Sequence, residues 1–264
     1  MIKLVALVKA KEGMSRDAFI KRYEEGHVPL IQELLPYHRD YRRSYIIPGT
    51  IVAPAHIDGN VTKPAFDAVA ELWYDSQEQL DKFTSGLKGS VGRLVAEDEA
   101  DLFDRTRIVK FEVEEFTTQP AVLRPRPRNH IGSPAVKRII FLKKKPMMTR
   151  EAFIDYYERN HVALALKLLV DNGHCVYADY RRNFPIPDGL SKTNHENSPA
   201  SDIDFDVMTE MWFWTAADHQ IFHDLIADPK IGAAFAADER NLFDRSALSI
   251  FSTDEFIAPP RNKS

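Results

Sequence analysis

The chain carries the same set of sequence segments twice, in the same order. Residues 15–30 (SRDAFIKRYEEGHVPL) return as 149–164 (TREAFIDYYERNHVAL), and 41–49 (YRRSYIIPG) return as 180–189 (YRRNFPIPDG). Two further segments repeat, FDAVAELWYD as FDVMTEMWFW and DEADLFDR as DERNLFDR, and the offset drifts only from 134 to 140 residues. Two copies are too few for a solenoid, which needs about three to bury a continuous core. The duplication predicts two like domains packed on each other, a fused form of a homodimer.

The repeats divide the chain into four parts. We expect a first repeat over 1–116, a Pro-rich linker over 117–134, a second repeat over 135–257 and a C-terminal tail over 258–264. The linker (TTQPAVLRPRPRNHIGSP) has four prolines and few apolar residues, which is typical of a semi-rigid connector.

Composition narrows the class of protein. With 264 residues, 44% of them apolar, the chain has room for two compact domains. A net charge of −4 without a Lys/Arg cluster argues against nucleic-acid binding. A single cysteine, Cys175, fits a reducing cytoplasm, and no apolar run reaches the ~18 residues of a membrane span. We therefore expect a cytoplasmic protein without a signal peptide or a membrane partner.

Each copy shows the pattern β-α-β-β-α-β, the split βαβ arrangement of a ferredoxin-like fold. Ser15 and Thr149 are good N-cap residues ahead of the first helices. The expected strands are 2–8, 41–47, 66–74 and 107–114 in the first copy and 136–142, 180–186, 205–214 and 247–253 in the second, with second helices over 76–87 and 216–226.

Such a sheet leaves one face bare, and the sheet of the other repeat is the obvious partner for it. The fold class we expect is α+β, with two antiparallel sheets packed face to face as a barrel. Alternation along the third strand places Asp67, Glu71 and Trp73 on one side and Ala68 and Ala70 on the other. We assign the first set, with its counterparts Asp206, Glu210 and Trp212, to the face turned away from the helices, lining a cavity inside the barrel.

Together these segments resemble the EthD domain of the dimeric α/β-barrel superfamily. The resemblance rests on Phe-x-x-x-Tyr-x-x-x-His-x-x-Leu, a tyrosine-led strand, Phe-Asp-x-x-x-Glu-x-Trp and Asp-Glu-x-x-x-Phe-Asp, in that order in both copies. It implies a pocket in each half. Relatives in the superfamily are mostly cofactor-independent enzymes on aromatic or polyketide-like substrates, and a minority bind haem. The fold therefore leaves the reaction open.

His27 and His161 are the leading candidates for catalysis. Each follows Phe and Tyr at four-residue spacing, which places it on the inward stripe of a helix, and Pro29 is expected to end the first helix just beyond His27. A helix C-terminus favours the imidazolium, which suits a general acid. The alternative is a histidine that only caps the last carbonyls.

For each remaining candidate, a purely structural role stands beside the catalytic or binding role. Asp67, Glu71, Asp206 and Glu210 can act as a base facing the histidine, or can pair with arginines. Tyr41 and Tyr180 can hold an oxyanion, or can be ordinary strand residues. Candidates for substrate binding are the indoles of Trp73 and Trp212, which can also be core residues, and the guanidinium groups of Arg43 and Arg182.

A metal site has little support in the sequence. His219 and His223 have i, i+4 spacing without the glutamate of a metalloprotease helix, and His56 and His195 lie elsewhere. No glycine-rich phosphate loop is present, so we expect neither a metal nor another cofactor.

We therefore predict a cofactor-independent lyase or isomerase (dehydration, decarboxylation or tautomerisation) acting on a hydroxylated aromatic or polyketide-like molecule by histidine proton transfer. The alternatives are a cofactor-free monooxygenase and a non-catalytic carrier of aromatic metabolites. Two chains can also associate further as a homodimer.

Overall fold

The computed structural model describes residues 1–51, 64–170, 176–187 and 204–258. Cys175, His56 and His195 lie outside these residues. The first repeat runs β1 (Ile2–Val8), α1 (Arg16–Arg22), the π-helical turn η1 (Tyr23–His27), α2 (Val28–Leu34), β2 (Asp40–Ile46), β3 (Ala68–Tyr74), α3 (Gln77–Gly86), α4 (Gly89–Leu102), the 3-10 turn η2 (Arg105–Arg107) and β4 (Val109–Thr117).

The second repeat follows the same order after a short 3-10 turn in the linker, η3 (Pro120–Val122). Its elements are β5 (Val136–Lys144), α5 (Arg150–Tyr156), the π-helical turn η4 (Tyr157–His161), α6 (Val162–Val170), β6 (Asp179–Pro185), β7 (Val207–Phe213), α7 (Ala216–Ala227), α8 (Pro229–Leu242) and β8 (Phe243–Ile257). Among the described residues, no helix is long and apolar enough to cross a membrane.

The expected element order is confirmed, with one helix per repeat missing from the expectation. Ser15 and Thr149 are the N-caps, because their side-chain oxygens accept the backbone N–H of Ala18 and Ala152. The first residues of the DExxLFDR segments lie in these additional helices. Asp98 and Glu99 belong to α4, and Asp238 and Glu239 belong to α8; the buried positions of both helices follow helical spacing.

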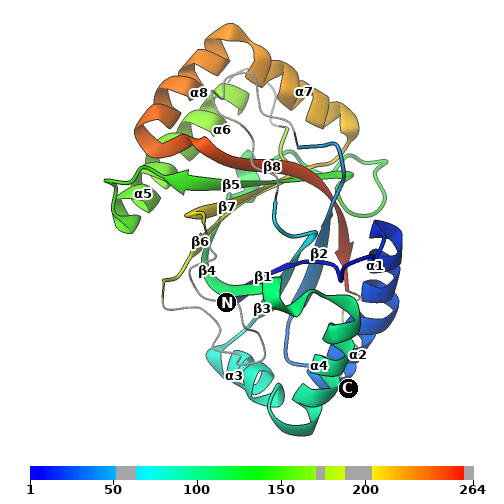
Figure 1. Cartoon of the computed structure of the whole chain (residues 1–264). Coiled ribbons are helices and arrows are strands. Elements are labelled where there is room, and N and C mark those ends of the chain that lie inside the picture. Colours follow the sequence, from blue (N-terminus) through cyan, green and yellow to red (C-terminus); the bar gives the residue numbers. More distant parts are fainter. Residues whose placement is uncertain (52–63, 171–175, 188–203, 259–264) are drawn as a thin grey trace.

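The strands close into a single barrel in the order β1-β3-β2-β8-β5-β7-β6-β4. All pairs are antiparallel, and the two repeats are joined edge to edge where β4 pairs with β6 and where β2 pairs with β8. The helices of the first repeat lie on one side of the barrel and those of the second on the opposite side (Figure 1). The α+β barrel predicted from the duplication is confirmed.

The predicted alternation along the third strand is confirmed. Val69, like Val5 and Leu7 of β1, belongs to the apolar cluster inside the barrel. Ala68 and Ala70 pack instead with the helices outside it. Side chains of one strand therefore serve two separate layers, and a residue cannot contribute to both.

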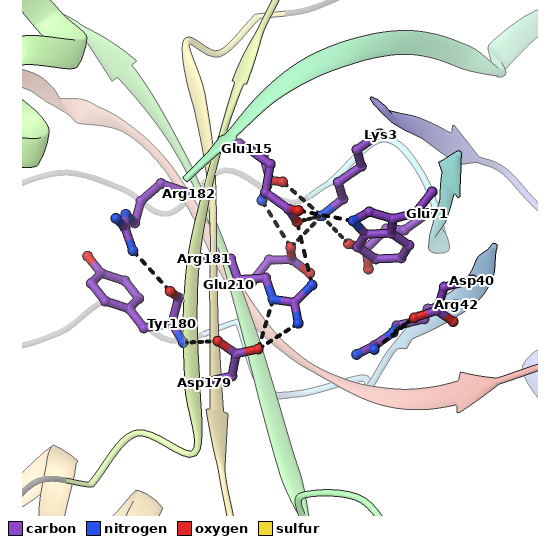
Figure 2. A network of polar contacts seen from close by, with 12 residues as sticks. Lys3, Asp40, Arg42, Glu71, Glu115, Asp179, Tyr180, Arg181, Arg182 and Glu210 are labelled. Carbon is purple, nitrogen blue, oxygen red and sulfur yellow. Dashed lines mark hydrogen bonds and ion pairs between the residues drawn. The ribbon is translucent and has the colours of Figure 1, made fainter. Parts of the chain in front are cut away.

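Inside the barrel, a layer of buried charges joins the two repeats. Lys3 Nζ lies 2.7 Å from Glu71 and 2.8 Å from Glu210, and Lys137 Nζ lies 2.7 Å and 2.6 Å from the same two carboxylates. Glu115 and Glu255, on the last strand of each repeat, complete the layer, at 3.1 Å from Lys3 and 2.9 Å from Lys137 respectively. We call these six residues the ionic layer. Figure 2 shows Lys3 with Glu71, Glu115 and Glu210.

The indole N–H groups of Trp73 and Trp212 donate to Glu115 and Glu255, each at 3.0 Å. The lysine ammonium groups lie over the same rings, at 4.4 Å from the centroid of Trp73 and 4.5 Å from that of Trp212. This part of the barrel is therefore packed with paired charges. The expectation that Glu71, Glu210, Trp73 and Trp212 line an open cavity there is wrong.

We expect Lys137→Met to lower the free energy of unfolding by about 3–5 kcal/mol, the usual cost of removing one partner from a buried ion pair. The substitution leaves Lys3 as the one lysine of the ionic layer for Glu71 and Glu210, and it removes the lysine that Glu255 contacts. Urea denaturation followed by circular dichroism measures the effect. The matched control is Lys82→Met, which removes a lysine from an exposed i, i+4 pair with Glu78. Equal denaturation midpoints for the two variants would contradict the importance of the layer.

Candidate functional site

Each repeat has a cavity between the outer face of its sheet and its own helices. The cavity of the first repeat is about 50 Å³ and that of the second is about 90 Å³. Both are lined by the same core of residues, a histidine, two tyrosines, a phenylalanine and a glutamate: His27, Tyr23, Tyr41, Phe103 and Glu99 in the first, and His161, Tyr157, Tyr180, Phe243 and Glu239 in the second.

Each histidine is held by an aspartate from the last helix of its repeat. His27 Nδ1 lies 2.6 Å from Asp98 Oδ2, and His161 Nδ1 lies 2.6 Å from Asp238 Oδ2. Both histidines are buried. A carboxylate accepts the Nδ1–H proton, so that in the neutral ring Nε2 is the acceptor nitrogen. The pair therefore orients an imidazole as a base in the wall of each cavity.

Asp98 also accepts a hydrogen bond from Arg22. Burial opposes ionisation of Asp98, but the hydrogen bonds from His27 and Arg22 outweigh it and hold the pKa of Asp98 below its usual value. Asp98 is thus ionised at neutral pH and can stabilise an imidazolium on His27.

The aspartates were missed as site residues, since the helices that carry them, α4 and α8, were not predicted. The buried positions of α4 follow one another at spacings of three and four (Gly92, Val95, Glu99 and Leu102), which is a helical signal. Recognising it would have placed Asp98 on a helix. Its contact with a histidine 71 residues earlier in the chain has no signal in a single sequence.

The histidines do not end their helices. His27 is the last residue of a π-helical turn, and the helix continues through Val28 and Pro29 to Leu34. The prediction that Pro29 ends the helix is wrong. The same π-turn ends at His161, although Ala163 stands where the first repeat has Pro29, so the proline does not cause the turn. A helix C-terminus therefore does not favour the imidazolium here, and the aspartate takes that role.

Tyr41 and Tyr180 lie on the cavity side of their strands. Tyr41 donates to Tyr23 at 3.1 Å, and Tyr157 shares a 2.8 Å hydrogen bond with Thr209. Burial raises the pKa of Tyr41 and of Tyr180 to about 12, although Arg43 and Arg182 lower it in part. Both phenols stay protonated at neutral pH and can donate to an oxyanion.

The carboxylates of the third strands do not face the histidines. Glu71 and Glu210 belong to the ionic layer on the inner face, whereas His27 and His161 lie against the outer face. Asp67 binds Lys9 and the backbone N–H of Ala10, and Asp206 accepts the N–H of Lys144. The expectation of a carboxylate opposite the histidine is wrong for all four, because strand alternation separates the two faces.

Arg43 and Arg182 have structural partners. Arg43 donates to Glu24 at 2.9 Å and to the carbonyl oxygen of Tyr41 at 2.7 Å. Arg182 makes the equivalent bonds to Glu158 and Tyr180, and also one to Thr118. Neither is among the residues that line the two cavities, so the structure places no substrate against them.

The second cavity carries polar residues that the first lacks. Arg138 and Thr209 line it where Leu4 and Ala70 line the first, and His223 joins them from α7. Arg138 pairs with Met211 in the sheet, and Leu4 pairs with Leu72. Arg138 and Leu4 therefore hold equivalent positions in the two repeats.

In the part of the chain that the structure describes, no group of three or more His, Cys, Asp or Glu side chains is arranged to hold a metal.

We expect His219→Leu to make stability less dependent on pH. Burial, together with the charges of Arg138 and His223, lowers the pKa of His219 from 6.5 to about 4. The folded state therefore favours the neutral ring, and this stabilisation is complete above pH 6.5 and is lost as the pH falls towards 4. Urea midpoints at pH 4.5 and pH 7 measure it. The control is His130→Leu at a half-buried position in the linker. An equal loss in wild type and His219→Leu would contradict the interpretation.

Comparison with solved structures supports the fold. An anthrone oxidase-like protein has a TM-score of 0.55 at 10% identity, covering 97% of this chain and 92% of its own. A proposed monooxygenase from Lactobacillus acidophilus NCFM has a TM-score of 0.52 at 9% identity, covering 97% and 95%. An EthD family protein from Bacillus halodurans C-125 covers 42% of this chain with 95% of its own, at 23% identity and a TM-score of 0.28. By sequence, no curated protein matches the chain significantly.

The EthD domain matches residues 11–106 and again residues 145–246, which together make up most of the chain. The chain belongs to the EthD domain family, as a tandem of two such domains.

Proposed function

We propose that the cavity of the second repeat is the active site of a cofactor-independent lyase or isomerase. Its substrate would be a hydroxylated aromatic or polyketide-like small molecule, and His161 would move the proton. The observation that carries the proposal is the 2.6 Å contact between His161 Nδ1 and Asp238 in the wall of an apolar cavity.

Proton transfer follows from the tautomer that Asp238 imposes. With Nδ1–H donated to the aspartate, Nε2 takes a proton from an acidic C–H or O–H of the substrate, and the electron pair moves onto a carbonyl oxygen as an enolate. Tyr180, protonated at neutral pH, donates to that developing oxyanion. Return of the proton from Nε2 to another atom completes a tautomerisation, and its delivery to a leaving hydroxyl completes a dehydration.

The walls suit a flat apolar ring. Tyr177 stacks on Tyr180 with the centroids 5.0 Å apart and the planes at 19°, and Phe222 and Phe243 lie in the same wall. Aromatic side chains of this kind bury a large area and prefer ring partners. The second cavity is favoured over the first because it is larger and holds more polar groups for recognition.

A cofactor-free monooxygenase is the second candidate. The same base could generate an electron-rich enolate or phenolate that reacts with oxygen, and two proteins of similar fold are named as an oxidase-like protein and a proposed monooxygenase. An oxygen electrode separates the two reactions, because the lyase or isomerase consumes none. The third candidate is a carrier of aromatic metabolites. It would bind ligand without turnover, both as wild type and as a variant that lacks both histidines.

We expect the wild type to accelerate exchange of the ring hydrogens of phloroglucinol in D2O, and His161→Ala to slow this exchange by about 10²–10⁴-fold. Phloroglucinol exchanges through its keto tautomer, so proton NMR measures the proposed step directly. The matched control is His27→Ala, which removes the equivalent pair of the first repeat and should retain most of the rate.

Asp238→Asn should lose much of the rate while still binding the ring, because the amide no longer holds His161 in the required tautomer. No exchange above the solvent background with wild type, or full activity of a variant lacking both histidines, would contradict the proposed function.

A further inference from the structure

Arg138 is a buried cation without an acidic partner among the described residues. It is 3% exposed and lines the second cavity. The other buried cations of the barrel wall and interior, Lys3, Lys137, Arg43 and Arg182, each contact a carboxylate. Placing an uncompensated charge in an apolar site costs considerable free energy unless something neutralises it.

Two histidines of α7 surround the guanidinium group and supply no charge to balance it. His223 Nε2 lies 2.7 Å from Arg138 Nη1 and 3.1 Å from His219 Nε2. Burial lowers the pKa of Arg138 to about 10, and burial with the arginine charge lowers the pKa of both histidines. At neutral pH the cluster thus carries one positive charge.

The guanidinium group does not use all of its hydrogen-bond donors within the described part of the chain. Nη1 is directed to His223, while Nε has no hydrogen-bond partner in the described structure. The one acid in the same wall, Glu239, lies 3.8 Å from Arg245 on β8. A guanidinium group binds a carboxylate through parallel N–H donors, and such pairs are strongest where water is excluded.

The first repeat shows that the fold does not require this charge. Leu4 stands in place of Arg138. Leu80 stands in place of His219, because each lies four residues after the N-cap of its helix, Ser76 in α3 and Thr215 in α7. The same strand and helix therefore carry two leucines and Thr84 in one half and an Arg-His-His cluster in the other. A purely structural role does not account for the difference.

We propose that Arg138 is an anion-binding residue that selects ligands with a carboxylate group for the second cavity. The ring of such a ligand would lie against Tyr177 and Phe222, with its carboxylate paired to the guanidinium group. This inference rests on the proposed function for the location of the site and deepens it by naming the substrate class, an aromatic acid. The first cavity, with Leu4, would not share this selectivity.

Benzoate and its neutral isostere benzamide, titrated into the full chain by calorimetry, test the inference. We expect wild type to bind benzoate at least tenfold more tightly than benzamide. Arg138→Leu should bind the two alike, and Arg138→Lys should keep a reduced preference for benzoate because it keeps the charge and loses the planar fork. The control Arg159→Leu removes the same charge from an exposed ion pair with Asp155 and should behave as wild type.

Two results would overturn the inference: no saturable binding of benzoate by wild type, or equal benzoate affinity in wild type and Arg138→Leu. Melting curves establish that the variants are folded, and Arg138→Lys provides the comparison if the leucine variant is not. His161→Ala should keep the benzoate preference. If His161→Ala loses hydrogen exchange but keeps its preference for benzoate, the two readouts are independent. Failure of the proposed function can then be told apart from failure of this inference.

Discussion

The ionic layer at the centre of the barrel is the interaction on which the rest of the structure depends. Each lysine contacts the third-strand glutamate of its own repeat and that of the other, so neither repeat can satisfy its inner face alone. Burial and the neighbouring Glu210 raise the pKa of Glu71, whereas Lys137 and Lys3 overcome burial and lower the pKa of Glu210. The closed barrel is the arrangement in which all of these charges have partners.

This packed layer also explains where the cavities lie. Glu71 and Glu210 are committed to the lysines inside the barrel, and the two cavities that contain the histidines lie between each sheet and its helices. The π-turns bring His27 and His161 to the space between each sheet and its helices, and α4 and α8 bring the aspartates that orient them. A π-turn inside a helix is a feature that often accompanies a functional site.

The two repeats share a His-Asp pair but differ in the residues around it. The His-Asp pair, the buried tyrosines and the aromatic wall recur in both cavities. Arg138, Thr209 and His223 occur only in the second, where the cavity is larger. The duplication has thus preserved the parts that maintain the fold and the base while changing the polarity of one pocket. Such a division is expected where one copy retains recognition of a ligand and the other serves mainly as its structural partner.

The sequence by itself determined the duplication, the element order, the N-caps at Ser15 and Thr149 and the two faces of the third strand, because these depend on local periodicity and hydrogen bonding. It also placed His27 and His161 correctly on the inward stripe of a helix. Only the tertiary structure decided which charged groups meet: Glu71 with Lys137, His27 with Asp98, and Arg138 with no carboxylate among the described residues. Strand alternation says that Glu71 and Tyr41 point to opposite faces, but which face receives a ligand depends on how the barrel interior is filled. That filling is set by contacts between residues far apart in the chain, which a single sequence does not encode in any local pattern.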